Sequence, residues 1–285
     1  MNKILALCPL HSQTLSQYQD KLVHLPHLES TSVDLEEWRR VLETYRHTTI
    51  IFGGGVMSRE MLSIWRELLP QQQLRGLRRG TTLATCDLEA AKKFGIQIFN
   101  TPGVNAPFVA QFIYDSLRNP HQIKTCAILG AGNIGGRVAK LMAQHDCEIR
   151  IFRKKPVQLS EIKEKKIFYS PDIFSACTGA DAVIVALPLS DLTRGLLHHE
   201  LVHKLPKGSQ WVSVSLPDVF TEETFRTLHG RKDIHVVIDE LESLFPQMMK
   251  ILGVNKLRKH FNLVEKAARS EACQKAMDDA VLMLI

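Results

Sequence analysis

Three glycines, Gly130, Gly132 and Gly135, have the spacing of a phosphate-binding turn. They follow the apolar run "TCAIL" and open a stretch with helical character. In such a strand–turn–helix unit the first glycine allows a tight turn, the second lets the backbone approach a diphosphate, and the third lets helix and strand pack closely. The helix N-terminus favours the anion. Because a second apolar run follows at 148–152, the pattern predicts a dinucleotide site. The alternative is a glycine turn that binds no ligand.

The second apolar run ends in basic residues. An Asp or Glu at this point would hold the ribose hydroxyls of NAD, whereas here Arg153 is followed by Lys154 and Lys155. A guanidinium can pair with the 2′-phosphate of NADP. The sequence therefore favours NADP(H) over NAD(H), the alternative being a solvated basic strand end.

Short apolar runs and amphipathic helical stretches alternate along the chain, which predicts an α/β protein with parallel sheets covered on both faces. The expected strands lie within 3–9, 48–54, 74–80, 95–101, 124–132, 148–154, 180–188, 209–217 and 233–240. The expected helices lie within 35–45, 59–69, 86–95, 106–117 and 265–285, and the last could close either domain.

Composition narrows the classes of protein that remain. The 285 residues allow two domains, and we find no apolar run long enough to span a bilayer. The net charge of +6 comes from dispersed basic residues without interleaved aromatics, which argues against a nucleic-acid interface. The six cysteines are scattered, with no CxxC, which predicts reduced thiols and a cytoplasmic location. No metal site is expected.

Several collinear motifs resemble the D-isomer-specific 2-hydroxyacid dehydrogenases. They are the substrate-loop segment 77–111, the fingerprint "LGAGNIGGRVAK", the long signature at 179–225 and "IHVVIDELESLFP". The resemblance implies a flavodoxin-like lobe (1–104 plus 265–285) and a Rossmann-type, doubly wound dinucleotide-binding lobe (105–264). It also implies reduction of a small 2-oxo acid by hydride from a nicotinamide. The basic strand end is similar to the NADP-preferring glyoxylate and hydroxypyruvate reductases of that family.

The resemblance also implies the residues that contact the cofactor. These lie in the glycine turn, at the end of the second strand, and after the later strands of the Rossmann lobe. They are Gly130, Gly132, Asn133, Ile134, Gly135, Arg153, Lys154, Leu187, Pro188, Thr193, Ser215 and Asp239.

The catalytic positions implied by the resemblance depart from the family pattern. The arginine that binds the substrate carboxylate falls on Leu216, and the glutamate that tunes the acid–base histidine falls on Leu244. The usual Pro-His pair is absent. Glu242 and His260 are the only weak substitutes, because Glu242 is two residues short and His260 misses the expected position.

The substrate side and the dimer interface depart from the pattern too. Thr82 replaces a glycine of the carboxylate-binding loop, and Phe108 and Gln111 replace a Ser and a Glu. The segment from Gln111 to Lys124 is short, so we do not expect the family's usual dimer.

Three further glycines at 53–55 could form an anion nest, although a strand-end turn before a helix capped by Ser58 is favoured.

These departures favour a family member that binds NAD(P) but has lost most 2-oxo acid reductase activity. One alternative is an active NADP(H)-dependent oxidoreductase with relocated catalytic groups. Another is an interaction protein that has lost the cofactor, which the intact glycines argue against. The expected partners are a dinucleotide and possibly a small 2-oxo acid, with no nucleic acid and no membrane.

Overall fold

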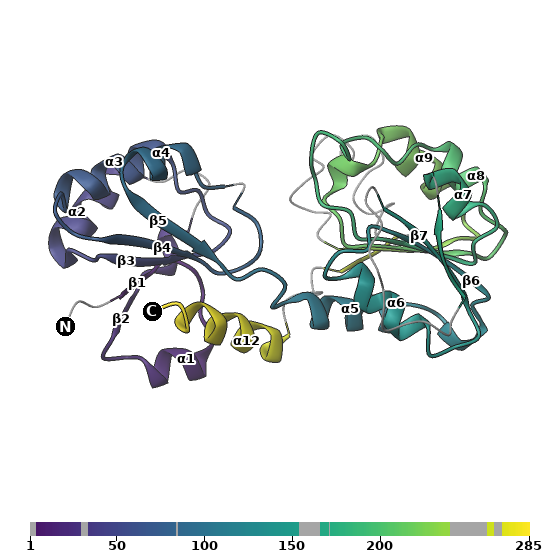
Figure 1. Cartoon of the computed structure of the whole chain (residues 1–285), viewed down its shortest axis with the longest axis horizontal. Coiled ribbons are helices and arrows are strands. Elements are labelled where there is room, and N and C mark those ends of the chain that lie inside the picture. The colour runs from purple at the N-terminus through teal and green to yellow at the C-terminus, as the bar shows by residue number, and fades with distance from the viewer. Residues whose placement is uncertain are drawn as a thin grey trace. The chain divides into compact units, whose positions relative to one another are not determined.

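The computed structural model describes residues 4–29, 34–83, 85–153, 166–170, 172–239, 261–264 and 270–285. The chain divides into two compact units (Figure 1). Unit 1 comprises Met1–Asn105 with Ser270–Ile285, and unit 2 comprises Ala106–Arg269. The expected lobe boundary at 264/265 adjoins residues 265–269, which lie outside the described residues.

Unit 1 contains a five-stranded parallel sheet with the order β2-β1-β3-β4-β5. This is the flavodoxin-like order that the resemblance implied. The strands are β1 (Ile4–Ala6), β2 (Leu22–His24), β3 (Thr49–Phe52), β4 (Leu74–Arg78) and β5 (Ile96–Asn100).

Helices cover both faces of this sheet, with α2, α3 and α4 on one face and α1 and α12 on the other (Figure 1). Two fully buried tryptophans, Trp38 and Trp65, anchor the first face, and their indole N–H groups donate to the carbonyl oxygens of Met61 and His47. The helices are α1 (Ser12–Gln17), the 3-10 turn η1 (Pro26–Leu28), α2 (Leu35–Tyr45), α3 (Arg59–Leu68), α4 (Leu88–Lys93) and α12 (Glu271–Leu282).

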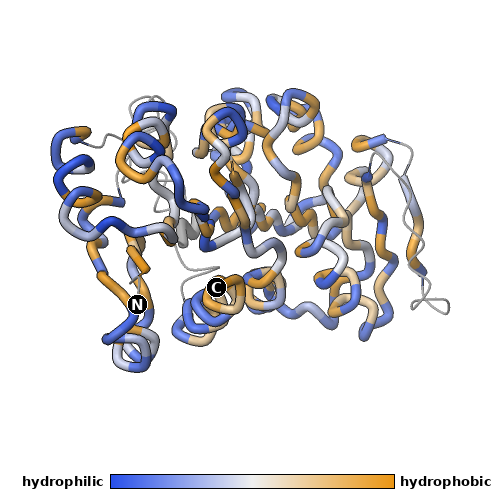
Figure 2. The backbone as a smooth tube through the Cα atoms, turned by 60° about the vertical axis from the view of Figure 1, so that its left-hand side comes forward, coloured by the Kyte–Doolittle hydropathy of each residue, from blue (hydrophilic) through white to orange (hydrophobic). Residues whose placement is uncertain are grey.

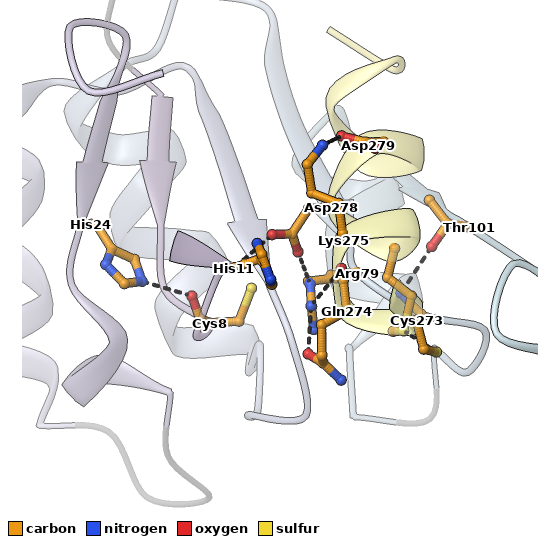
Figure 3. Close-up of polar contacts among 12 residues, drawn as sticks. Cys8, His11, His24, Arg79, Thr101, Cys273, Gln274, Lys275, Asp278 and Asp279 are labelled. Atoms are coloured by element: carbon orange, nitrogen blue, oxygen red, sulfur yellow. Dashed lines mark hydrogen bonds and ion pairs between the residues drawn. The ribbon is translucent and has the colours of Figure 1, made fainter. Parts of the chain in front are cut away.

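The C-terminal helix α12 returns to unit 1, which settles the alternative left open by the sequence. Arg79, directly after β4, forms an ion pair with Asp278 of α12 and also donates to Gln274 (Figure 3). Asp278 is fully buried, and its second carboxylate oxygen accepts from the backbone N–H of His11 at 2.7 Å. These contacts join the two ends of the chain within one unit.

Unit 2 contains a seven-stranded parallel sheet with the order β12-β11-β10-β9-β6-β7-β8. The first strand of this unit, β6, lies between β7 and β9, so the chain reverses its direction of travel across the sheet there, as in a doubly wound Rossmann fold. The strands are β6 (Thr125–Leu129), β7 (Glu148–Phe152), β8 (Ile167–Ser170), β9 (Ala182–Val185), β10 (Gln210–Ser213), β11 (His235–Asp239) and β12 (Phe261–Val264).

Two helix layers cover this sheet, with α5 and α6 on one face and α7, α8 and α9 on the other (Figure 1). The central strands β9 and β10 are completely buried, and Figure 2 shows the strands largely in the hydrophobic colour. The helical elements are α5 (Ala106–Asp115), η2 (Pro120–Gln122), α6 (Gly135–Met142), α7 (Ile173–Cys177), α8 (Glu200–His203), η3 (Pro217–Val219) and α9 (Glu222–Gly230).

The predicted α/β fold class with two parallel sheets is confirmed. Three strands were not anticipated: β2, β8 and β12. Each lies at the edge of its sheet, where a strand has only one neighbour. In β8 the side chains of Phe168 and Tyr169 are exposed, so this strand lacks the continuous apolar run that marks a central parallel strand.

Candidate functional site

The glycine turn joins β6 to α6 at the carboxyl edge of the unit 2 sheet. Gly130 has φ +97°, and a Cβ there would lie 2.6 Å from the carbonyl oxygen of Ala186. A Cβ at Gly135 would lie 1.9 Å from the carbonyl oxygen of Gly130, so only glycine lets the helix start this close to the strand end. These are the steric roles expected for Gly130 and Gly135.

The middle of the turn is open. Gly132 is exposed, and a Cβ at this position would meet nothing within 4 Å. Asn133 is also exposed, and Ile134 occupies the cap position of α6 without a side-chain hydrogen bond. No side chain caps the helix, although the N–H groups of Gly136 and Arg137 donate to the carbonyl oxygens of Gly132 and Ile134. The N-terminal end of a helix favours an anion. The turn therefore fits a diphosphate.

Arg153 lies beside this turn. It directly follows β7, which pairs with β6 along its whole length, and its Nη1 donates to the carbonyl oxygen of Ala131 at 3.2 Å. In a Rossmann site the end of the second strand faces the ribose of the adenosine. Lys154 and Lys155 lie outside the described residues.

The other expected cofactor residues lie along the same sheet edge, on the far side of β6. Leu187 and Pro188 follow β9, and the backbone N–H of Leu187 donates to the hydroxyl of Ser215 at 2.8 Å. Thr193 closes the loop after Pro188, because its hydroxyl donates to the carbonyl oxygen of Pro188 at 2.6 Å. Asp239 is the last residue of β11 and is partly buried.

The position expected for a carboxylate-binding arginine has an apolar side chain. Leu216 lies three residues after Ser213, the last residue of β10, and its side chain is 42% exposed. Arg194 and Asp218, from the loops after β9 and β10, form an ion pair with each other. Glu242, Leu244 and His260 all lie outside the described residues. Within the described ranges, no group of His, Cys, Asp or Glu could hold a metal ion.

The cysteines do not supply a nucleophile. All six are buried and unpaired. Burial raises the pKa of the thiols of Cys8 and Cys177 to about 12, and those of Cys86 and Cys147 to about 11. These thiols are therefore protonated at neutral pH, whereas nucleophilic attack requires the thiolate.

Sequence reasoning missed two features of this edge. The acceptor of Arg153 is the backbone oxygen of Ala131, and a backbone group leaves no signal in residue types. The Arg194–Asp218 pair joins residues 24 positions apart in sequence. The loops after the parallel strands β9 and β10 lie side by side there, and the N–H of Gly195 donates to the carbonyl oxygen of Asp218.

The family profile described as "D-isomer specific 2-hydroxyacid dehydrogenase, NAD binding domain" matches residues 114–261, which is just over half of the chain. The chain belongs to the D-isomer-specific 2-hydroxyacid dehydrogenase family. The matched region contains the glycine turn, Arg153 and Leu216. The matched region therefore spans both the glycine turn and the position at which the substrate-binding arginine was expected.

Relatives of this chain include an erythronate-4-phosphate dehydrogenase from Marinomonas sp., 23% identical over 210 residues. The match covers 69% of this chain and 54% of that protein, so the chain spans about half the length of this relative. A D-3-phosphoglycerate dehydrogenase from Bacillus subtilis is 25% identical over 171 residues, covering 51% of this chain and 32% of that protein.

Solved structures share the fold at low identity. The D-lactate dehydrogenase of Escherichia coli has a TM-score of 0.77 and 14% identity, with 99% of this chain and 95% of that chain covered. The NAD⁺-bound 3-phosphoglycerate dehydrogenase of Entamoeba histolytica has a TM-score of 0.75 and 17% identity, with 99% of this chain and 93% of that chain covered.

Across the residues described here, no helix is long and apolar enough to cross a membrane.

Proposed function

We propose that this chain is an NADP(H)-binding member of the family in which the 2-oxo acid reductase reaction is lost or strongly reduced. The observation that carries the cofactor proposal is the position of Arg153 at the end of β7, with its guanidinium beside Ala131 in the glycine turn. A dianionic 2′-phosphate gains charge-assisted hydrogen bonds from such a guanidinium. A ribose hydroxyl gains much less, so NADP(H) is favoured over NAD(H).

The loss of reductase chemistry is supported by Leu216. NADPH supplies a hydride, but a 2-oxo acid must also be held by its carboxylate and polarised at its carbonyl. An exposed leucine side chain can do neither. Desolvating a carboxylate against an apolar group without a partner costs several kcal/mol, so substrate binding should fail as well as chemistry. Arg194 does not replace the missing cation, because its guanidinium is paired with Asp218.

Titration of the unmodified protein with NADPH and with NADH tests the cofactor proposal, with nicotinamide fluorescence as the readout. NADPH should bind more tightly at low ionic strength. Equal affinities would contradict the assignment of Arg153, and no binding of either nucleotide would favour an interaction protein without cofactor.

The buried, unpaired cysteines support the expected cytoplasmic location, which remains a prediction.

A further inference from the structure

The connector between α5 and β6, residues 116–124, lies against the amino edge of the unit 2 sheet. Gln210, the first residue of β10, holds the backbone of Arg118 on both sides. Its Oε1 accepts from the Arg118 N–H at 2.7 Å, and its Nε2 donates to the Arg118 carbonyl oxygen at 2.9 Å. Asp181, directly before β9, accepts from the backbone N–H of Lys124 at 2.9 Å. Side chains at the starts of two neighbouring strands therefore fix the connector.

A third anchor of the connector, His235, can change its charge near neutral pH. It is the first residue of β11 and pairs with Gln210 of β10 in the sheet. Its Nε2 lies 3.3 Å from the carbonyl oxygen of Ser116, the residue that follows α5. Because a carbonyl oxygen only accepts, the imidazole donates from Nε2, and the proton that would make it a cation adds to Nδ1.

The surroundings of His235 oppose that second proton. Burial and the positive charge of Arg118 hold the pKa of the imidazole below its ordinary value of about 6.5, and the hydrogen bond to Ser116 offsets this only in part. The backbone of Arg118 is held by Gln210, so its charge stays at this edge as long as the connector is bound. Protonation therefore favours a state in which His235 is exposed to water and Arg118 has moved away.

The carboxylates at these strand ends are engaged by other groups. Asp233, two residues before His235, forms an ion pair with Arg231 at 2.8 Å. Asp181 accepts from backbone N–H groups of the chain at the end of the connector. The neighbouring strand β12 is preceded by His260, which lies outside the described residues and is therefore varied separately in the test.

We propose that His235 is a pH-sensitive latch of the connector: the neutral imidazole holds Ser116 against the sheet edge, and protonation releases residues 116–118. Release exposes the imidazole to water and carries the charge of Arg118 away from it. The connector continues α5, the first helix of unit 2, whose buried residues share a hydrophobic cluster with those of α6. Acid therefore loosens the end of this helix layer. The device goes beyond the proposed function, because it needs no nucleotide.

The latch acts on the first part of the connector only. Leu117 is buried, which keeps this part bound while His235 is neutral. Asn119 has a left-handed backbone (φ +47°) and is followed by a proline, so the chain turns sharply there. Beyond the turn, Ile123 is buried and the N–H of Lys124 is bound to a carboxylate that is independent of His235. The second part of the connector therefore stays anchored when residues 116–118 are released.

The test uses the full chain without nucleotide, labelled with ¹⁵N and followed by NMR from about pH 8 to about pH 5, the range in which histidine titrates. The amide signals of residues 116–118 should shift together with the imidazole signals of His235, with a midpoint below about 6.5. Because the opening is linked to one proton, the hydrogen-exchange protection factor of the Arg118 N–H should fall by up to about tenfold per pH unit as the pH drops below about 6.5.

Four variants assign the effect to one residue. His235→Gln keeps a donor for Ser116 but does not titrate, so the connector should stay bound and its pH dependence should disappear. Arg118→Gln removes the like charge and leaves the backbone contacts in place, so the midpoint should rise. His121→Gln, which removes an exposed histidine from the same connector, is the matched control and should behave as the unmodified protein does. His260→Gln should behave likewise.

Several results would overturn the proposal: a transition at residues 116–118 that persists in His235→Gln, one that is lost in His121→Gln or His260→Gln, or an unchanged midpoint in Arg118→Gln. Titration of His235 without any shift at residues 116–118 would overturn it too. If His235→Gln fails to fold, as judged by circular dichroism, the midpoint of Arg118→Gln decides the result. No nucleotide is present, so failure here leaves the cofactor proposal to its own test.

Discussion

The guanidinium of Arg153 donates a hydrogen bond from Nη1 to the carbonyl oxygen of Ala131 over 3.2 Å, across the first turn of the dinucleotide fold. Here the turn itself supplies the acceptor, so the cation is positioned within the structure that also receives the diphosphate.

Replacing Arg153 with aspartate should reverse the cofactor preference. The variant removes a charge-assisted hydrogen bond to the 2′-phosphate and adds a repulsive charge, so NADPH affinity should fall roughly tenfold or more. NADH binding should be retained. In the unmodified protein the preference should shrink as salt rises, since the pair lies near solvent. Fluorescence titrations at low and high salt measure both effects.

The control for this variant is Arg226→Gln, which removes a charge from the surface of α9, where Arg226 pairs with Glu222. It should leave both affinities unchanged. A preference for NADPH that survives in Arg153→Asp would show that another group recognises the phosphate.

Replacing either of two adjacent glycines in α6 with alanine should have different effects on the free energy of unfolding. Gly135→Ala places a methyl group 1.9 Å from a backbone oxygen and should destabilise the protein by about 1–3 kcal/mol. Gly136→Ala meets nothing within 4 Å and should be neutral or stabilising by up to about 1 kcal/mol. Urea unfolding without ligand measures the difference. Similar effects of the two substitutions would contradict the close packing of helix and strand.

The buried pair between Arg79 and Asp278 should be essential to unit 1. Asp278→Asn leaves the Arg79 guanidinium buried without a counter-charge, and breaking such a pair costs about 3–5 kcal/mol. Asp279→Asn is the matched control. Asp279 forms a more exposed ion pair with Lys275, which lies one turn earlier on the same helix. Chemical denaturation should show a large loss for the first variant and less than about 1 kcal/mol for the second.

The short segment between α5 and β6 should prevent the family's usual dimer. Only residues 116–124 connect the end of α5 to the start of β6, and they include the single turn η2. We expect a monomer, or a dimer formed through another surface, and light scattering measures the mass. A crystal structure with a dimer joined through the Rossmann units in the family's usual way would contradict this expectation.

The central strands and the glycine turn could be predicted from sequence because their signals are local. Strand β9, for example, is four consecutive buried apolar residues, and the turn needs glycine for steric reasons within six positions. The edge strands β2, β8 and β12 have weaker local signals. For β8, the exposed Phe168 and Tyr169 explain why: an edge strand buries less and lacks a continuous core pattern.

The sequence could not reveal which charges are paired. Arg78 and Arg79 are identical in type and adjacent, yet among the described residues only Arg79 forms an ion pair with a carboxylate. That carboxylate belongs to Asp278, which lies 199 positions further along the chain. For the glycines at 53–55 the sequence favoured a strand-end turn before a helix capped by Ser58 over an anion nest. The structure confirms the Ser58 cap of α3, and it also shows that the N–H of Gly55 donates to the carboxylate of Glu29.

The measurement that tests the account most directly follows NADPH through binding and oxidation in one sample. The protein is titrated with NADPH until the fluorescence change saturates, and glyoxylate, hydroxypyruvate or pyruvate is then added while absorbance at the nicotinamide band is recorded. The account predicts saturable binding followed by oxidation near background, with no rescue by Leu216→Arg, because the acid–base group is also missing. A robust rate that Leu216→Ala leaves unchanged and His260→Ala abolishes would contradict it and establish a relocated active site.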